Sequence, residues 1–242
     1  MQNPIIHIFL HLTNTSSRVR GRDFYAVNDD LRLSTSLHGQ TSTRKSSIKL
    51  NLALAGTLPG LSFAREFLKL AVRAAVNYAS TKKWLTYWNS SPIHADIARA
   101  APFLLKKIFR PYMTSRLRCD ERLGVLTSHY DFIVQQKLSS LILRAATEPV
   151  VLSEFSGKSA QVYQIQLVVG CDMEREGEMV LQLVSEGSIL FSVAFTFYTD
   201  AGVRTVPIGC LQGGRKANSL DHIRYATRDM FGLRPKTLMV KL

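Results

Sequence analysis

The sequence has few cysteines and no pattern that would organise them. Three cysteines, Cys119, Cys171 and Cys210, are distributed over 242 residues. They are odd in number and include no CxxC pair, so neither a disulfide framework nor a cysteine zinc site is indicated. The six histidines are scattered along the chain, and their one HxxxH pair, His7 and His11, has no cysteine near it. This spacing argues against a metal site built by the protein alone.

Long apolar runs and the common nucleotide-binding motifs are missing as well. The apolar stretch 48–64 contains Lys49, Asn51 and Pro59, and it is too short and too polar to span a bilayer. The opening MQNPIIHIFLHL lacks a basic start and a small-residue cleavage site, so it is not typical of a signal peptide. Neither G-x-G-x-x-G nor the full P-loop motif G-x-x-x-x-G-K-[ST] occurs, since Gly157-Lys158-Ser159 lacks the first glycine of that motif. We therefore expect a cytoplasmic protein.

Acidic residues are scarce, and the net charge of +13 is unevenly distributed. Residues 1–130 hold 19 Lys or Arg against 7 Asp or Glu, and residues 208–242 hold 7 against 2. The segment 131–207 between them is acidic, with 5 against 9. Such a distribution favours anionic partners without identifying one. We disfavour nucleic acid, because no recognised binding motif accompanies the charge.

The hydrophobic pattern predicts an α+β protein in which helices precede a sheet. Residues 1–47 are expected to be a disordered extension, and residues 48–242 a single domain with a helical part, 60–148, and a sheet part, 160–242. One buried stripe is predicted from apolar residues that recur at helical spacing: Leu61, Ala64, Phe67, Leu68, Ala71, Val72, Ala75 and Val76. Ser91 and Pro92 predict the start of a second helix, and a third is expected over 119–146.

From residue 160 onward the apolar period changes to two. Three segments alternate in this way: QVYQIQLVV, EMVLQLV and ILFSVAFTFY. Short turn sequences separate them, so an antiparallel meander is expected. A fourth strand, RTVPIGCL, contains Pro207, which suits an edge position. A helix from about Leu220 to Phe231 should follow, ended by Gly232.

The loop QGGRK between the fourth strand and this helix is the main candidate binding site. A strand, a glycine loop and a helix N-terminus present several backbone N–H groups at one point. Gly213 and Gly214 would allow close backbone approach, and Arg215 and Lys216 could hold an anion together with Gln212. A tight turn with solvated cations explains the same residues.

The segment VPIGCLQGGRKANSLDHIRYATRDMFGLRPKTLMV resembles the signature of the bacterial VirK/YbjX family. The pieces FLLKKIFRPYM, RLGVLTSHYDFI, REGEMVLQLV and ILFSVAFTF fit the same family in the same order, and the resemblance covers residues 60–242. It implies a domain of unknown function associated with virulence, envelope properties and tolerance of antimicrobial peptides. Family members continue past the last residue here, so we expect the C-terminal portion of the family domain to be missing.

A more distant resemblance is to the acyl-CoA N-acyltransferases, which also place a loop and a helix after a fourth strand. Their loop follows Q/R-x-x-G-x-G/A. Gln212 and Ala217 fall in register with it, but Arg215 stands at the middle glycine position, where a side chain would crowd a phosphate. The resemblance implies acyl-CoA as a cofactor. A fold analogy alone is a weak argument for function.

Glu178 is the candidate catalytic residue. Asp172, Glu174, Glu176 and Glu178 alternate, so in an extended strand they would share one face. Mutual repulsion would then raise a pKa, as a general base requires. A solvated hairpin tip around Gly177 explains these carboxylates equally well.

Two functions therefore remain open. In the first, the domain binds an anionic small molecule such as acyl-CoA through Gln212–Lys216, with Glu178 as base. In the second, it is a non-catalytic basic protein that binds acidic lipid, at the periphery of the inner membrane, or a protein partner. The oligomeric state is not predicted.

Overall fold

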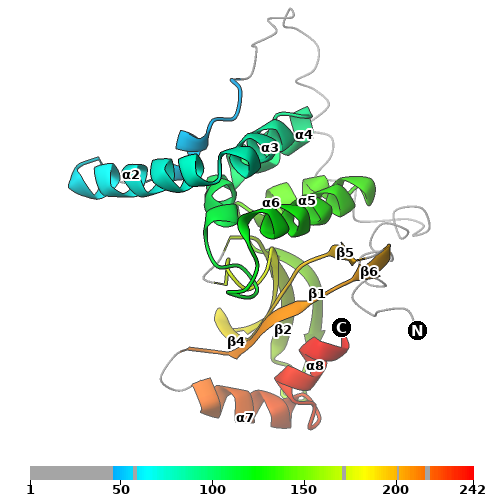
Figure 1. The fold of residues 1–242 in the computed structure, drawn as a ribbon. Coiled ribbons are helices and arrows are strands. Elements are labelled where there is room, and N and C mark those ends of the chain that lie inside the picture. Colours follow the sequence, from blue (N-terminus) through cyan, green and yellow to red (C-terminus); the bar gives the residue numbers. More distant parts are fainter. Residues whose placement is uncertain (1–45, 57–58, 171–172, 201, 216–218) are drawn as a thin grey trace, which may run out of the picture. The chain divides into compact units, whose positions relative to one another are not determined.

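The computed structural model describes residues 46–56, 59–170, 173–200, 202–215 and 219–242. Within this part of the chain, residues 47–240 form one compact unit. Helices come first and an antiparallel sheet follows, so the α+β prediction is confirmed (Figure 1). Residues 1–45 of the predicted N-terminal extension lie outside the described residues.

The helical part consists of short helices and two 3-10 segments. In chain order they are η2 (Leu50–Leu54), α2 (Leu61–Val76), α3 (Tyr78–Trp88), α4 (Pro92–Ala100), η3 (Pro102–Phe109), α5 (Cys119–Gln135) and α6 (Ser139–Ala145). The predicted start of α4 is confirmed: the Ser91 side chain accepts a hydrogen bond from the N–H of His94, and Pro92 is the first helical residue.

The predicted helix over 119–146 is two helices. α5 ends at Gln135, and Lys137 adopts a positive φ of 58°. The N–H of Leu138 then donates to the carbonyl of Ile133 at 2.9 Å, and this hydrogen bond closes a loop of six residues, 133–138. This is the Schellman arrangement, which usually uses glycine at the left-handed position. The lysine there gave no such signal in the sequence.

Five strands form the main sheet in the order β1-β2-β3-β4-β7, with every neighbouring pair antiparallel. They are β1 (Val150–Ser156), β2 (Val162–Val168), β3 (Met179–Ser185), β4 (Ser188–Phe195) and β7 (Ile208–Gly213). The predicted meander is confirmed, but β1 precedes the predicted sheet part. The predicted fourth strand is also divided. Its first residues form β6 (Val203–Thr205), which pairs with β5 (Tyr198–Asp200), and β7 begins after Pro207.

Both faces of the central strand are covered, since all seven residues of β3 are buried. α6 packs against β1 and α7 (Ser219–Asp229) against β4. In Figure 1, α5 and α6 lie above the sheet, whereas α7 and α8 (Pro235–Lys241) lie below it. The sequence pattern predicted that alternate residues of β3 share one buried face. In the structure the residues between them are buried as well.

A buried aspartate holds α7 against the β1–β2 hairpin. Asp229 accepts hydrogen bonds from the N–H of Ser159 at 2.8 Å and from the hydroxyl of Tyr163 at 2.9 Å. The apolar side chains of this segment are only partly buried. Met230 is buried, but Leu220 and Phe231 are 68% and 72% exposed. Gly232, with φ 85°, ends the segment as predicted.

The buried stripe predicted for α2 is wrong. Of its 16 residues only Leu70 is buried, and Leu70 does not belong to the predicted stripe. The residues of that stripe are exposed instead, among them Leu61, Leu68 and Val76 at 92%, 64% and 78%. The helix forms as the periodicity predicts, but it presents its apolar face outward.

Candidate functional site

The predicted glycine loop is a continuation of the β4–β7 ladder. The N–H of Gly214 donates to the carbonyl of Leu190 at 3.0 Å. A β-carbon at Gly214 would approach the carbonyl oxygen of Ile189 to 2.5 Å, so this position requires glycine for close strand contact. The Gly214 amide is therefore used within the sheet, and it is not available to an anion.

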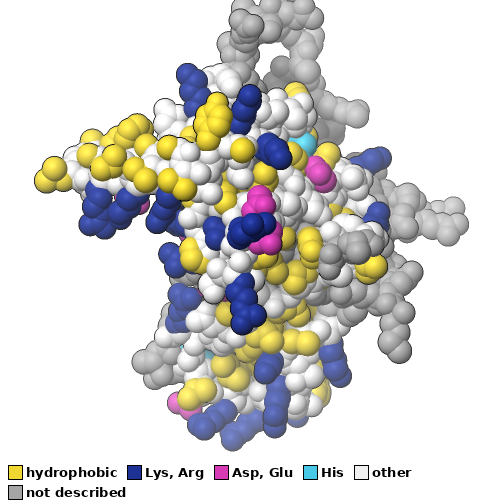
Figure 2. Space-filling model, viewed as in Figure 1, with side chains coloured by type: hydrophobic (Ala, Val, Ile, Leu, Met, Phe, Trp, Pro, Cys, Tyr) yellow, Lys and Arg dark blue, Asp and Glu magenta, His cyan; other side chains and the backbone are white. Residues whose placement is uncertain are grey.

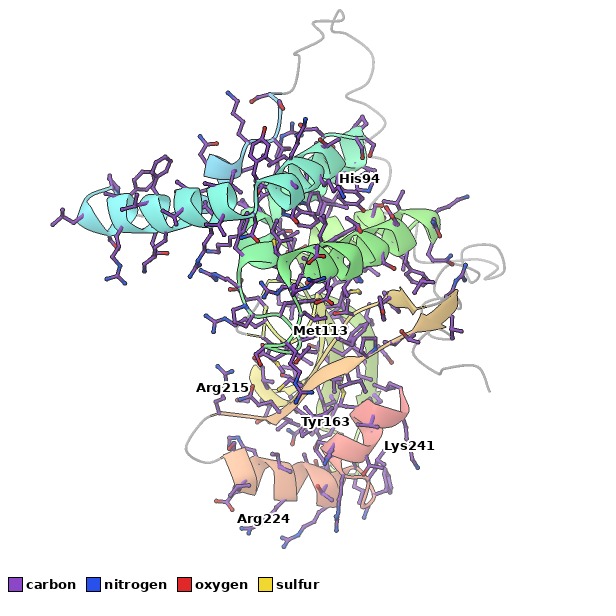
Figure 3. The ribbon with its side chains drawn as sticks, in the orientation of Figure 1. His94, Met113, Tyr163, Arg215, Arg224 and Lys241 are labelled. Carbon is purple, nitrogen blue, oxygen red and sulfur yellow. The ribbon has the colours of Figure 1, made fainter. Side chains whose placement is uncertain are left out.

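The neighbouring residues of the loop are arranged differently. Gly213 stands opposite Phe191, next to the hydrogen-bonded position of Gly214, so antiparallel alternation turns its N–H away from β4. Arg215 is exposed at the end of β7 and donates from Nη2 to Gln212 Oε1 at 3.0 Å (Figure 3). Lys216 lies outside the described residues.

A hollow of about 460 Å³ borders this loop on the side of α7 and α8. A β-carbon at Gly213 would lie 3.3 Å from Cδ1 of Ile223, which lines the hollow. Phe191 of β4 and Pro235, the first residue of α8, complete an apolar floor. The loop therefore approaches the hollow only through the contact of Gly213 with Ile223, and no described loop residue lines it.

Four cations surround the hollow: Arg224 and Arg228 from α7, Arg234 from the connection, and Lys236 from α8. Arg224, labelled in Figure 3, forms an ion pair with Asp221 at 3.2 Å. The other three are exposed, and none pairs with a carboxylate within the described part of the chain. The rim of the hollow thus carries uncompensated positive charge.

Glu178 lies elsewhere, in a buried polar cluster between the helical part and the sheet. Its Oε1 accepts from Lys107 Nζ at 2.5 Å, and its Oε2 accepts from the Tyr130 hydroxyl at 2.6 Å. The side chains of Lys107 and Glu178 are only 5% and 0% exposed. The cluster extends to Thr196, which shares a hydrogen bond of 2.7 Å with Tyr112. It links η3 and α5 to the sheet, at the start of β3 and the end of β4.

The surroundings of Glu178 favour its ionised carboxylate. Burial alone would raise its pKa, but Lys107, His129 and the hydrogen bond from Tyr130 together lower the pKa below its ordinary value. The prediction that Glu178 is a general base assumed a raised pKa, whereas its surroundings lower it. The same burial and the charge of Glu178 raise the pKa values of Tyr112 and Tyr130 well above the ordinary phenol value.

The structure does not bring Glu178 and the glycine loop together. The N–H of Glu178 donates to the carbonyl of Phe195, whereas that of Gly214 donates to Leu190. These acceptors are five residues apart on β4, and five residues of extended strand span about 17 Å. Glu178 is therefore too far from the loop to take a proton from a ligand bound there.

The acidic segment before β3 is not a strand. Residues 173–176 form a turn, so the four carboxylates do not share a strand face. Glu174 pairs with Arg110 at 2.9 Å, and Asp172 lies outside the described residues. The solvated-tip interpretation is also wrong for Glu178, which is 2% exposed.

Sequence reasoning missed three participants of this cluster, Lys107, His129 and Thr196. Lys107 lies in a basic run on η3, and its partner Glu178 is 71 residues away. His129 accepts at Nδ1 from the N–H of Phe197 at 3.1 Å. No local pattern links these positions. Only the approach of α5 to the end of β4 brings them together.

Among the residues described, no group of three His, Cys, Asp or Glu side chains is placed to hold a metal ion. In the same residues, no helix combines the length and the apolar character needed to cross a membrane.

Fold and site thus define an α+β protein with an antiparallel five-stranded sheet and a basic hollow beside its last strand. The chain belongs to the family described as "Protein of unknown function (DUF535)", whose model matches residues 60–242. It is 27% identical over 202 residues to "Uncharacterized protein YbjX" of Escherichia coli (strain K12). The resemblance to the VirK/YbjX family is therefore confirmed.

The aligned region is 81% of this chain and 60% of the relative, so the chain spans about 60% of the relative's length. No solved structure matches the chain significantly. Neither the family description nor the relative's name states an activity.

Proposed function

We propose that this domain binds a small amphipathic anion in the hollow between α7, α8 and β4, and that acyl-CoA represents the chemical class. One observation carries the proposal. Three cations, Arg228, Arg234 and Lys236, surround a concave surface with an apolar floor, and none of them has a carboxylate partner among the described residues. Charge on the rim and apolar surface below it together match a ligand with a phosphate and a hydrocarbon part.

The charge argument concerns the rim. Two guanidinium groups can each form paired hydrogen bonds with a phosphate, and Lys236 adds a point charge. Arg224 is already paired with Asp221, so it contributes less. The three unpaired cations are exposed, which limits each contact to a modest strength in water. Binding should therefore depend on several contacts made at once.

The apolar argument concerns the floor. Phe191 is 8% exposed, and Pro235 is buried, so a ligand would cover surface that is already partly shielded from water. The volume of about 460 Å³ lies within the range of small-molecule sites, roughly 300–1,000 Å³. Contact with a hydrocarbon chain contributes roughly 0.8 kcal/mol for each CH₂ group removed from water.

In this proposal Gly213 lies behind one wall of the site, because a side chain there would press on Ile223, which lines the hollow. Ligand binding is proposed without an acyl-transfer step, since Glu178 lies at the other end of the ladder. A protein that binds amphipathic anions is compatible with the envelope-related setting that the VirK/YbjX resemblance implies.

The test is calorimetric titration of the chain with octanoyl-CoA, CoA and the uncharged detergent octyl glucoside, each below its aggregation threshold. We expect octanoyl-CoA to bind more tightly than CoA and octyl glucoside not to bind. The double variant Arg228→Gln/Arg234→Gln should weaken octanoyl-CoA binding at least tenfold. The control Lys82→Gln/Lys83→Gln removes two exposed charges from α3 and should leave the affinity unchanged.

Two results would contradict the proposal. Equal weakening by both double variants would mean that binding follows net charge and not the hollow. Absence of any octanoyl-CoA binding at millimolar concentration would exclude the site for this class of ligand. Gly213→Val serves as an independent probe, because its added methyl groups enter the hollow beside Ile223 without removing a charge.

A further inference from the structure

α2 presents an apolar face to its surroundings. Large side chains on this face are Leu61, Phe67, Leu68, Val72 and Val76, which are between 49% and 92% exposed. Three exposed alanines, at positions 64, 71 and 75, lie among them. At 100° per residue these positions cover about half of the helix circumference. An unbroken apolar surface of this kind rarely faces water without a binding partner.

The opposite side of α2 faces the rest of the domain, and it is largely polar. Glu66, Lys69 and Arg73 border a small hollow with Leu54 of η2, and Leu70 is the only buried residue of the helix. Contacts of α2 run to η2, η3 and α3. The usual orientation of a surface helix is thus reversed, and burial within this domain does not explain the apolar face.

We propose that the outward face of α2 binds the surface of an anionic lipid bilayer, with the helix axis in the plane of the membrane. This inference goes beyond ligand binding in the α7–α8 hollow, because it concerns a different element and a different partner. α2 has the features of interfacial helices: a strong separation of apolar and polar faces, phenylalanine and leucine on one side, and cations on the other.

Charge complementarity identifies the bilayer as anionic. Lys69 and Arg73 lie beyond the boundary of the apolar face, and Arg65 lies near that boundary, between Val72 and Val76. Lys82 and Lys83 follow on α3. The single acid of α2, Glu66, is paired with Lys69 at 2.9 Å. Figure 2 shows hydrophobic side chains along α2 with Lys and Arg side chains directly beneath them. Each cation close to an anionic surface strengthens the attraction of the helix to it.

The shape of the surface favours a bilayer over a protein partner. A single helix is convex and offers no groove for a peptide. A second copy of the chain would place its own cations against Arg65 and Arg73, which is unfavourable at short distance. The 16 residues of α2 span about 24 Å, which suits lying on a membrane and not crossing it.

The test is flotation of the chain with phosphatidylcholine vesicles that contain 0% or 30% phosphatidylglycerol, at low and high salt. We expect binding to the anionic vesicles only, and weaker binding at high salt. The variant Phe67→Gln/Leu68→Gln should reduce the bound fraction at least tenfold. Both side chains are exposed, so the fold should not change.

The control Leu220→Gln/Phe231→Gln removes two equally exposed apolar side chains from the α7 segment, and it should bind as the unchanged chain does. Equal binding of the Phe67→Gln/Leu68→Gln variant would overturn the proposal. The proposal would also be overturned if light scattering showed a dimer for the unchanged chain and a monomer for this variant, with no vesicle binding by either. That result would assign the apolar face of α2 to a second copy of the chain. Octanoyl-CoA titration of the same variant separates the two proposals, because the α7–α8 hollow is unaltered in it.

Discussion

Acidification should destabilise the fold through His129. This side chain is 1% exposed on α5, stacks on the ring of Phe197 at 5.8 Å, and accepts the Phe197 N–H at Nδ1. Burial, with a smaller effect from Lys107, lowers the pKa of His129 from 6.5 to about 4, although Glu178 opposes the shift. The folded state therefore keeps the imidazole neutral at a pH where the unfolded chain is protonated.

The sign and the size follow from proton linkage. Between pH 6.5 and pH 4 the unfolded chain binds a proton at this residue and the folded chain does not, so stability falls as the pH is lowered. At pH 5 the difference corresponds to about 1.5 pH units, or about 2 kcal/mol. The loss approaches about 3 kcal/mol near pH 4 and does not grow further below it.

The measurement is urea unfolding at pH 7.5 and pH 5.0 of the chain and of His129→Asn. Asparagine places an amide oxygen where Nδ1 accepts the Phe197 N–H, so the buried N–H keeps an acceptor. We expect the variant to lose about 2 kcal/mol less between the two pH values, because the other titrating groups are common to both proteins. His222→Asn, at an exposed position on α7, is the control. An identical pH dependence of the chain and His129→Asn would refute the reasoning.

Two further predictions concern the core. Glu178→Gln leaves the ammonium of Lys107 buried without an anion, so it should lower the free energy of unfolding by about 3–5 kcal/mol. The double variant Lys107→Met/Glu178→Leu should lose clearly less than the sum of its two single changes. Additive losses in urea unfolding would argue against a coupled pair. Gly214→Ala should lower the midpoint of thermal unfolding, because its β-carbon meets the Ile189 carbonyl oxygen at 2.5 Å. Gly124→Ala on α5, with nothing within 4 Å, should instead stabilise by up to about 1 kcal/mol, and the opposite order would contradict this packing.

The Lys107–Glu178 pair bears on how the domain is organised. One partner comes from η3, and the other comes from the start of β3, so the pair ties the helical part to the sheet. Its geometry is that of a buried ion pair completed by the Tyr130 hydroxyl. Such pairs contribute little net stability but are costly to break. We therefore expect them to specify how the two parts dock more than how strongly the chain folds.

The sequence alone determined the features that depend on a few neighbouring residues. Ser91 and Pro92 begin α4 because capping needs only the next two or three backbone amides. The meander of β2, β3 and β4 follows from alternation and short turns, and Gly232 ends the last predicted helix. The resemblance that identified the family also lies in the chain itself, over residues 60–242.

Only the tertiary structure decided which of these local features are covered and which partners meet. The periodicity of α2 determined a helix with an apolar face, but it contained no information on whether another element would cover that face. The Gly214 amide became unavailable because β7 extends one residue along β4. Glu178 acquired a lysine 71 residues away and a lowered pKa. Burial and ion pairing depend on elements that are distant in sequence, and no local pattern encodes their approach.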